Sequence, residues 1–345
     1  MKIKKIVTIA TIILVMLGVL MIGVVIKNVS SISLTGKLSA DKLSISSKML
    51  NKEQESGIIN VAVFGLDNRE HTYEGDTRSD AIKVVSLDTV EQRASITSFQ
   101  RDILVNFSDD EFGLDKLNHA YWYGGAELTL KTLNYNFDLD LSRYITINYD
   151  GVEKLIDQIG GIEIELLNVE LKNLNENILD LNGLAGWENQ AFPIEEAGVQ
   201  ILGGRQAVAF MRIRTIGSDY ARMNRQTLVM RAVAQKLIKL DYSNLLNFIY
   251  EALSYIETNI QVDEIIKLLP QILSINLEEL KQDRIPKTGF DETIAIEYKG
   301  YNPVYLLNDY IQSVMDVHEI IYEETYLPID RIKINHEEIY GNVAP

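Results

Sequence analysis

Hydrophobic positions divide the chain into an uncharged run, a polar stretch and a long segment in which apolar and amphipathic runs alternate. Residues 6–26 carry no charge and are predominantly apolar over 21 positions. A helix of this length spans about 30 Å, the thickness of the hydrocarbon core of a bilayer. We therefore predict a transmembrane helix. A cleaved signal peptide is the alternative, although its apolar region normally covers about 7–15 residues.

The charges that flank this run predict its orientation. Lys2, Lys4 and Lys5 precede it, whereas Lys27 alone follows it. Because positive residues favour the cytoplasmic side, residues 1–5 are predicted to be cytoplasmic and the rest of the chain extracellular. Residues 27–57 are polar with scattered Leu and Ile, which predicts a stalk. The sequence thus favours a single-pass protein of the cell membrane with an extracellular domain over residues 58–345.

Short apolar runs in this domain alternate with helical patterns. Helical periodicity covers 125–135 and 151–159, and Gly160-Gly161 ends the second helix. The apolar runs predict strands at 60–65, 81–87, 94–99, 144–147 and 162–166. Such alternation is typical of an α/β fold, a layered α-β-α domain with a central mixed sheet.

The second half of the domain predicts mostly helices. Residues 171–197 are polar and irregular, which predicts a loop or small lid. The remaining predictions are a helix through 227–240, two or three helices over 242–280 with a break or kink at Pro270, an edge strand within 284–296 and a last helix over 303–322.

Composition narrows the classes of function. The 345 residues are 46% hydrophobic, which is enough for a large core. The absence of cysteine excludes disulfides, thiolate catalysis and cysteine-based zinc sites. A formal charge of −16 argues against a nucleic-acid partner, because phosphate would be repelled by most of the surface.

Arginines gather in one segment of this acidic chain. Six of the thirteen lie between residues 205 and 231, namely Arg205, Arg212, Arg214, Arg222, Arg225 and Arg231. If the backbone is extended at Arg212 and Arg214, both guanidinium groups point to one side. Arg222, Arg225 and Gln226 share one face of a helix that Ser218 or Asp219 can N-cap. Converging guanidinium groups favour a phosphate or pyrophosphate ligand. The alternative is that these arginines form a solvated helix face and pair with Asp and Glu.

Charged residues also follow or precede the predicted strands. Asp67 follows the first strand, Asp80 precedes the second and Arg101 follows the third. Two carboxylates together with phosphate oxygens form a usual ligand set for Mg²⁺. The alternative is that both aspartates only cap or turn the chain. His119 is interpreted as a structural hydrogen-bonding residue, with a general base as the alternative. Tyr121, Trp122 and Tyr123 are interpreted as core or pocket wall, with a sugar-stacking platform as the alternative.

Seven motifs between residues 65 and 226 resemble the LytR-CpsA-Psr proteins of Gram-positive cell envelopes. In order, they are GLDNR, RSDAI, SFQRD, KLNHAYWYGG, QIGG, LGGRQAVAFMRIR and DYARMNRQ. The resemblance, which covers about 60–240, implies a phosphotransferase that moves an anionic glycopolymer, teichoic acid or capsular polysaccharide, from undecaprenyl pyrophosphate to peptidoglycan. It also implies Mg²⁺ or Mn²⁺.

The resemblance assigns roles residue by residue. Asp67 and Asp80 correspond to the metal carboxylates. The pyrophosphate ligands correspond to Arg78, Arg101, Arg212, Arg214, Arg222 and Gln226. Arg101, Arg212, Arg214 and Asp219 form the catalytic set, in which Asp219 orients Arg222 or transfers a proton. Gln100 departs from the family pattern, which has proline there, and predicts a less rigid loop.

Three other functions stay open at this point. A polyprenyl-pyrophosphate hydrolase would use the same residues with water as the acceptor. A membrane-bound envelope regulator or attenuator would need a DNA-reading element, which an acidic extracellular domain does not supply. A plain envelope scaffold would not need loop aspartates beside clustered arginines.

Overall fold

The computed structural model describes most of the domain that the sequence predicts. The described residues are 33–34, 38–67, 77–108, 112–185, 190–214, 216–217, 219–287 and 293–342. The predicted membrane helix, residues 6–26, lies outside these ranges. Within them, no helix combines the length and the apolar character needed to cross a membrane.

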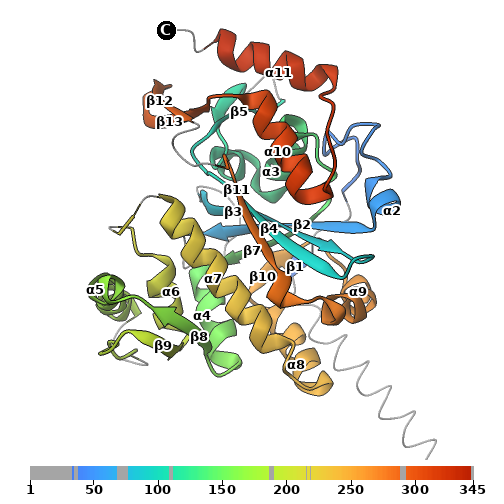
Figure 1. Ribbon diagram of the computed structural model, residues 1–345. Helices are drawn as coiled ribbons and strands as arrows, with labels where there is room; N and C mark the ends of the chain where they lie inside the picture. The colour runs from blue at the N-terminus through green and yellow to red at the C-terminus, as the bar shows by residue number, and fades with distance from the viewer. Residues whose placement is uncertain are drawn as a thin grey trace, which may run out of the picture.

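A seven-stranded sheet forms the centre of the fold (Figure 1). Its order is β1-β10-β7-β2-β3-β4-β11. The strands are β1 (Ser33–Leu34), β2 (Ile58–Leu66), β3 (Ser79–Asp88), β4 (Arg93–Phe99), β7 (Arg143–Asn148), β10 (Ile256–Thr258) and β11 (Lys281–Ile285). β3 runs antiparallel to both β2 and β4, whereas β7 runs parallel to β2. The predicted mixed sheet is therefore confirmed.

Helices cover both faces of the sheet (Figure 1). One face packs on α3 (His119–Phe137) and α10 (Tyr310–Tyr322), with α11 (Asp330–Gly341) beyond them. Phe64, Ile82 and Phe99 form part of the core on this side. The opposite face meets α7 (Asp219–Leu237), with α4 (Tyr149–Gln158) and α8 (Tyr242–Ala252) on the same side of the sheet. The alternation of apolar side chains along the strands supplies both faces, as expected for a layered α/β fold.

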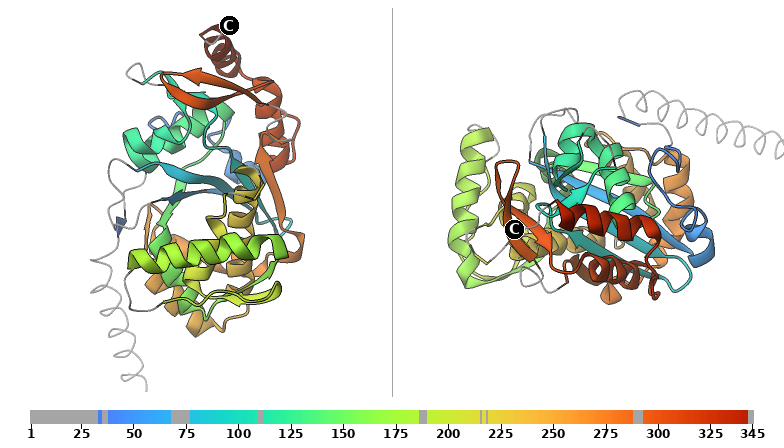
Figure 2. Two further views of the ribbon diagram at one scale, coloured as in Figure 1. Left: turned by 90° about the vertical axis from the view of Figure 1, so that its left-hand side faces the viewer. Right: turned by 90° about the horizontal axis from the view of Figure 1, so that it is seen from above.

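The remaining elements are short or peripheral. They are α2 (Lys52–Ser56), β5 (Leu104–Asn106), β6 (Leu114–Lys116), β8 (Ile162–Leu166), α5 (Asn168–Ala185), β9 (Gly198–Leu202), α6 (Gly204–Met211), α9 (Val262–Ser274), η1 (Leu277–Glu279), β12 (Thr293–Tyr298) and β13 (Tyr301–Leu307). Figure 2 shows α5 at the side of the molecule, next to the two-stranded sheet of β8 and β9. As predicted, α4 ends before Gly160-Gly161, because the N–H groups of these two glycines bond back to Asp157 and Ile156.

The prediction of a loop or lid over 171–197 is wrong for most of its length. Residues up to Ala185 form α5. Leu174, Ile178 and Leu181 are fully buried and recur at helical spacing, so they form the stripe that packs α5 onto the domain. The many asparagines and glutamates between them hide this stripe in the sequence, because such residues are usual in loops.

The C-terminal predictions need two corrections. β11 is an edge strand of the central sheet, but 293–298 forms a separate hairpin with 301–307. The last helix was predicted to begin at residue 303, yet α10 begins at Tyr310, and α11 follows it. Asp309 caps α10 by accepting from the N–H of Gln312 (2.9 Å), which fixes the start of the helix. Pro270 lies within α9 and does not end it.

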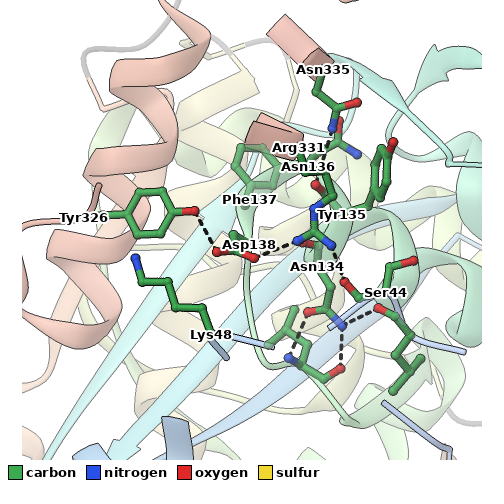
Figure 3. A network of polar contacts seen from close by, with 12 residues as sticks. Ser44, Lys48, Asn134, Tyr135, Asn136, Phe137, Asp138, Tyr326, Arg331 and Asn335 are labelled. Carbon is green, nitrogen blue, oxygen red and sulfur yellow. Dashed lines mark hydrogen bonds and ion pairs between the residues drawn. The ribbon is translucent and has the colours of Figure 1, made fainter. Parts of the chain in front are cut away.

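Residues 38–57, predicted as part of a stalk, pack on the domain. Leu43 and Met49 are buried in the main core. Figure 3 shows the polar network that secures them: Arg331 of α11 donates to the carbonyl of Ser44 (2.7 Å) and to the carboxylate of Asp138 (2.7 Å). Tyr326 donates to the other oxygen of the same carboxylate (2.7 Å). The folded domain thus begins before the residue that the sequence predicts.

Candidate functional site

Charged side chains from five segments meet where β2 ends and β3 begins. Asp67 directly follows β2, and Asp80 is the second residue of β3. The two aspartates are brought together because Leu66, the last residue of β2, pairs with Ser79, the first residue of β3. Arg101 follows β4, the other neighbour of β3. Arg214 follows α6, and Arg222 lies in the first turn of α7. The sheet order therefore brings together residues that are up to 155 positions apart.

Asp80 is the centre of this cluster. Arg101 donates through Nη1 to one carboxylate oxygen of Asp80. Arg214 donates through Nη2 to the other oxygen (2.8 Å), and the same nitrogen lies 3.6 Å from a carboxylate oxygen of Asp67. Arg101 also donates to Asp102 (3.1 Å). Burial alone lowers the pKa of Arg101, but the carboxylates of Asp80, Asp102 and Asp219 raise it, so this guanidinium stays charged.

The two loop aspartates can accept a cation. Burial and, next, the neighbouring charge of Asp80 raise the pKa of Asp67, while Arg212 and Arg214 oppose the shift. A further positive charge near Asp67 and Asp80 would reduce the repulsion between the two carboxylates. The described residues contain no group of three or more His, Cys, Asp or Glu side chains placed to hold a metal. Mg²⁺ commonly binds one or two carboxylates and completes its shell with phosphate and water, so the pair fits it.

The first turns of α7 present buried polar atoms without partners. Arg222 is 2% exposed, and its Nη2 lies 2.6 Å from Asp219, in a geometry that does not make a hydrogen bond. Within the described part of the chain, Nε and Nη2 of Arg222, Oδ2 of Asp219 and Oε1 of Gln226 have no hydrogen-bond partner. An unpaired buried polar group costs about 1–3 kcal/mol, so such a concentration points to a ligand that completes the site.

Arg212 reaches the cluster by a different route from the predicted one. Its backbone is not extended: it forms the C-cap of α6 with φ −88° and ψ −3°. Its N–H bonds to the carbonyls of Val208 (3.1 Å) and Ala209 (3.3 Å), which continue the helical turn. The guanidinium carbon lies 5.5 Å from the centre of the Tyr149 ring, close enough to Asp67 to lower its pKa. Arg212 and Arg214 therefore lie near the same carboxylate without a shared strand face.

Arg78 is held by aromatic rings. Its guanidinium carbon lies 5.2 Å from the ring centre of Trp122 and 5.8 Å from that of Tyr301. It forms no ion pair with any residue that the structure describes, so its charge is available to an anion.

Two arginines of the arginine-rich segment 205–231 are structural. Arg205 donates to Glu153 (2.8 Å), and Arg225 donates to Glu170 (2.8 Å) and to the carbonyls of Ile213 and Ile216. Of the alternative that the sequence left open, the pairing with carboxylates thus holds for Arg205 and Arg225, but both side chains are buried and do not form a solvated face. Arg225 also fixes the loop that carries Arg214, a positioning role that sequence spacing alone did not reveal.

Comparison with known proteins places these motifs in one family. The LytR_cpsA_psr family profile matches residues 24–310. The chain belongs to the LytR_cpsA_psr family.

Named relatives of this LytR_cpsA_psr protein include transferases and a regulator. It is 29% identical over 209 residues to the Polyisoprenyl-teichoic acid--peptidoglycan teichoic acid transferase TagU of Halalkalibacterium halodurans, over 59% of this chain and 61% of that protein. The match to the TagU of Enterococcus faecalis is 28% identical and covers 70% of this chain and 72% of that protein. Biofilm regulatory protein A of Streptococcus mutans is 29% identical, with 62% and 52% covered.

Solved structures share the fold. TagT bound to LIIa-WTA superposes with a TM-score of 0.59 at 23% identity, over 78% of this chain and 91% of that chain. The protein gbs0355 from Streptococcus agalactiae gives a TM-score of 0.66 at 22% identity, over 86% and 98%. TagT with bound octaprenyl pyrophosphate lipid gives 0.56 at 21%, over 76% and 90%.

Gln100 does not leave its loop unsupported in this LytR_cpsA_psr protein. The side chain is 1% exposed, and its Oε1 accepts from the hydroxyl of Tyr220 on α7 (2.7 Å). The backbone N–H of Gln100 bonds to Ile285 of β11 (3.0 Å). The predicted loss of rigidity is therefore offset by bonds to two neighbouring elements, which also hold Arg101 in place.

The aromatic motif residues divide into core and rim. His119 is fully buried and lies 3.0 Å from Asp115 through Nδ1, as expected for a structural residue. Tyr121 belongs to the main core. Trp122 is half-buried and Tyr123 is exposed, and their rings stack with centres 5.2 Å apart beside Arg78. The predicted core or pocket wall thus holds for Tyr121, whereas Trp122 supports Arg78.

The face of the sheet toward α7 carries half-buried apolar side chains. Lys83 contacts α7, so its side chain lies on this face. Val63 lies directly opposite Lys83 on β2, and Ile145 lies directly opposite Val63 on β7, so all three side chains share the face. Val85 and Ile147, two positions further along their strands, do the same. Val63, Val85, Ile145 and Ile147 all retain exposed surface although they face the helical layer. The sheet and the helices are therefore less tightly packed on this side than around Phe64.

Proposed function

We propose that this LytR_cpsA_psr protein is a phosphotransferase that moves an anionic glycopolymer, such as teichoic acid or capsular polysaccharide, from an undecaprenyl pyrophosphate carrier to peptidoglycan. The observation that carries the proposal is the convergence of Arg101 and Arg214 on the Asp67–Asp80 pair, beside buried polar atoms of Arg222, Asp219 and Gln226 on α7 that have no partner among the described residues. Two TagU relatives are named as teichoic acid transferases, which supports the same reaction class. The half-buried apolar face beside α7 is a suitable place for a polyprenyl chain.

Phosphoryl transfer depends mainly on positioning and on neutralising charge, which arginines provide without a cysteine or a serine nucleophile. In the proposed reaction, Arg78, Arg101, Arg212, Arg214, Arg222 and Gln226 bind the pyrophosphate. Asp67 and Asp80 would hold Mg²⁺ or Mn²⁺, which supplies further positive charge to the phosphate oxygens. An acceptor hydroxyl forms a bond to the phosphorus that carries the glycan, and the bridging P–O bond breaks to release undecaprenyl phosphate.

Asp219 is the side chain best placed to handle the proton of this acceptor. One of its oxygens contacts Arg222 and the other has no described partner. We assign it the proton that leaves the acceptor hydroxyl.

The proposed topology predicts where a protease can act. Because Lys2, Lys4 and Lys5 precede the apolar run, the chain after residue 28 should lie outside the cell membrane. Protease added to intact protoplasts should digest an epitope fused after Pro345 and leave one fused before Met1. Protection of the C-terminal epitope would rule out the extracellular location.

The transfer reaction can be tested with the full-length chain in detergent. We expect a defined polyprenyl-pyrophosphate glycan and peptidoglycan oligomers to give a joined product that mass spectrometry identifies by its added phosphodiester. EDTA should lower the yield at least 100-fold, and excess Mg²⁺ or Mn²⁺ should restore it. Released phosphoglycan without any joined product would identify a hydrolase. Binding of the lipid without turnover at any metal concentration would favour the regulator.

A further inference from the structure

Lys83 is a buried lysine that none of the motifs includes. It lies in the middle of β3, between Val63 of β2 and Ser98 of β4, and is 2% exposed. Its ammonium donates to the hydroxyls of Ser98 (2.7 Å) and Thr227 (2.9 Å) and to the carbonyl of Met223 (3.2 Å). These three neutral oxygens use all of its donors. The charge is therefore hydrogen-bonded, but no carboxylate of the described residues contacts it.

The position of this ammonium joins three elements that carry the site. Lys83 lies three residues after Asp80 on β3, and Ser98 lies three residues before Arg101 on β4. On α7, Met223 directly follows Arg222, and Thr227 directly follows Gln226. One side chain thus ties the strand that supplies a carboxylate, the strand that supplies an arginine and the helix that supplies two further ligands.

Keeping a charge at this position costs stability. Burial first, and then the charge of Arg222, lower the pKa of Lys83 to about 7, while Asp219 partly opposes them. Arg222 and Asp219 are the charged groups that face Lys83; both belong to α7, and the contact on β4 is neutral. The unfolded chain binds this proton up to about pH 10.4. The fold should therefore gain stability as the pH rises above about 7, and below that pH the charge is kept at the expense of stability.

An apolar side chain of similar length would avoid this cost, because the surrounding face of the sheet is apolar. We infer that Lys83 acts on the pyrophosphate site through its charge: the ammonium, held between β3, β4 and the first turns of α7, strengthens anion binding beside Arg222. The inference rests on the proposed pyrophosphate ligand. It does not depend on transfer, since binding alone reports it.

The test compares Lys83→Met with the unmutated full-length chain. Affinity for geranylgeranyl pyrophosphate is measured by calorimetry from pH 6 to 9, together with the melting temperature at each pH. At pH 6 we expect Lys83→Met to bind about tenfold more weakly and to melt at the same temperature or higher. The ratio of the two affinities, in which the ionisation of the ligand cancels, should approach one by pH 9, where Lys83 of the unmutated chain has lost its proton.

Two further variants separate charge from packing. Lys83→Gln keeps a donor for Ser98 and Thr227 without the charge and should bind as weakly as Lys83→Met at pH 6. Lys281→Met removes the same charge from β11, where Lys281 forms an exposed ion pair with Glu323 at the end of α10. This control should change neither the affinity nor the melting temperature.

Each other outcome contradicts a stated part. Equal affinities at pH 6 would overturn the inference. A lower melting temperature with a loss of affinity that does not vary with pH would show a purely structural lysine, and would also overturn it. If the unmutated chain binds no pyrophosphate, both the inference and the proposed function fail. Binding without transfer leaves the inference standing and removes only the transferase.

Discussion

Replacing Asp80 with asparagine should lower the rate of glycopolymer transfer about 100- to 1000-fold. Asp80 accepts from Arg101 and Arg214 on its two oxygens, so its charge positions both guanidinium groups. An asparagine keeps the shape but directs N–H donors at one of them and removes half of the proposed metal-binding pair. Loss of one preorganised electrostatic group at a reaction centre has an effect of this size. The rate is measured from the joined product by mass spectrometry.

A matched control lies on the same strand. Asp88 is at the far end of β3, where it pairs with Arg93 (3.1 Å) at the partly exposed turn between β3 and β4. Asp88→Asn should transfer at within about twofold of the unmutated rate, because exposed ion pairs contribute little and this one is remote from the site. If Asp80→Asn retained more than a tenth of the rate, Asp80 could not be central to the reaction.

Replacing Arg331 with alanine should lower the free energy of unfolding by about 3–5 kcal/mol. Asp138 is fully buried, and the change leaves its carboxylate with Tyr326 but without a cation (Figure 3). The carbonyls of Ser44 and Asn134 lose donors as well. Removal of one partner of a buried ion pair has a cost of this order. Guanidinium chloride unfolding of the full-length chain, followed by circular dichroism, measures the effect.

Two variants show whether the buried charge is the cause. Arg331→Met with Asp138→Asn removes both charges and should recover part of the lost stability. Arg93→Ala removes an exposed arginine that pairs with Asp88 and Glu323 and should cost at most about 1 kcal/mol. Equal losses for Arg93→Ala and Arg331→Ala would mean that the network in Figure 3 adds no more than an ordinary surface pair.

The sequence predicted elements whose signals are local. Alternating or continuous apolar runs marked β2, β3, β4, β7 and β8 to within a few residues, and Gly160-Gly161 marked the end of α4. The start of α7 at Asp219 was also predicted. Such signals arise from the backbone and from neighbouring side chains, so they need no knowledge of distant contacts.

Elements whose stability comes from packing were missed. α5 owes its place to three buried side chains among many polar ones. β10 is a three-residue strand that exists because it pairs with β7, more than 100 positions earlier in the sequence. The sequence predicts a helix from residue 303, but residues up to Leu307 belong to β13, because their backbone pairs with β12. In each case a tertiary contact outweighs local preference.

The sequence by itself determined which charged groups the site can draw on. Arginines clustered in an acidic chain favour an anion, and aspartates at strand ends suit a divalent cation, but pairing with carboxylates and capping of the chain stayed open as alternatives until the family resemblance was added. Sequence order could not determine which arginines are free to bind them. Arg205 pairs with Glu153 and Arg225 with Glu170, 52 and 55 positions away, whereas Arg214 reaches Asp80 across 134. Only the tertiary structure decides this, because a guanidinium pairs with whichever carboxylate the fold brings within about 3 Å of it.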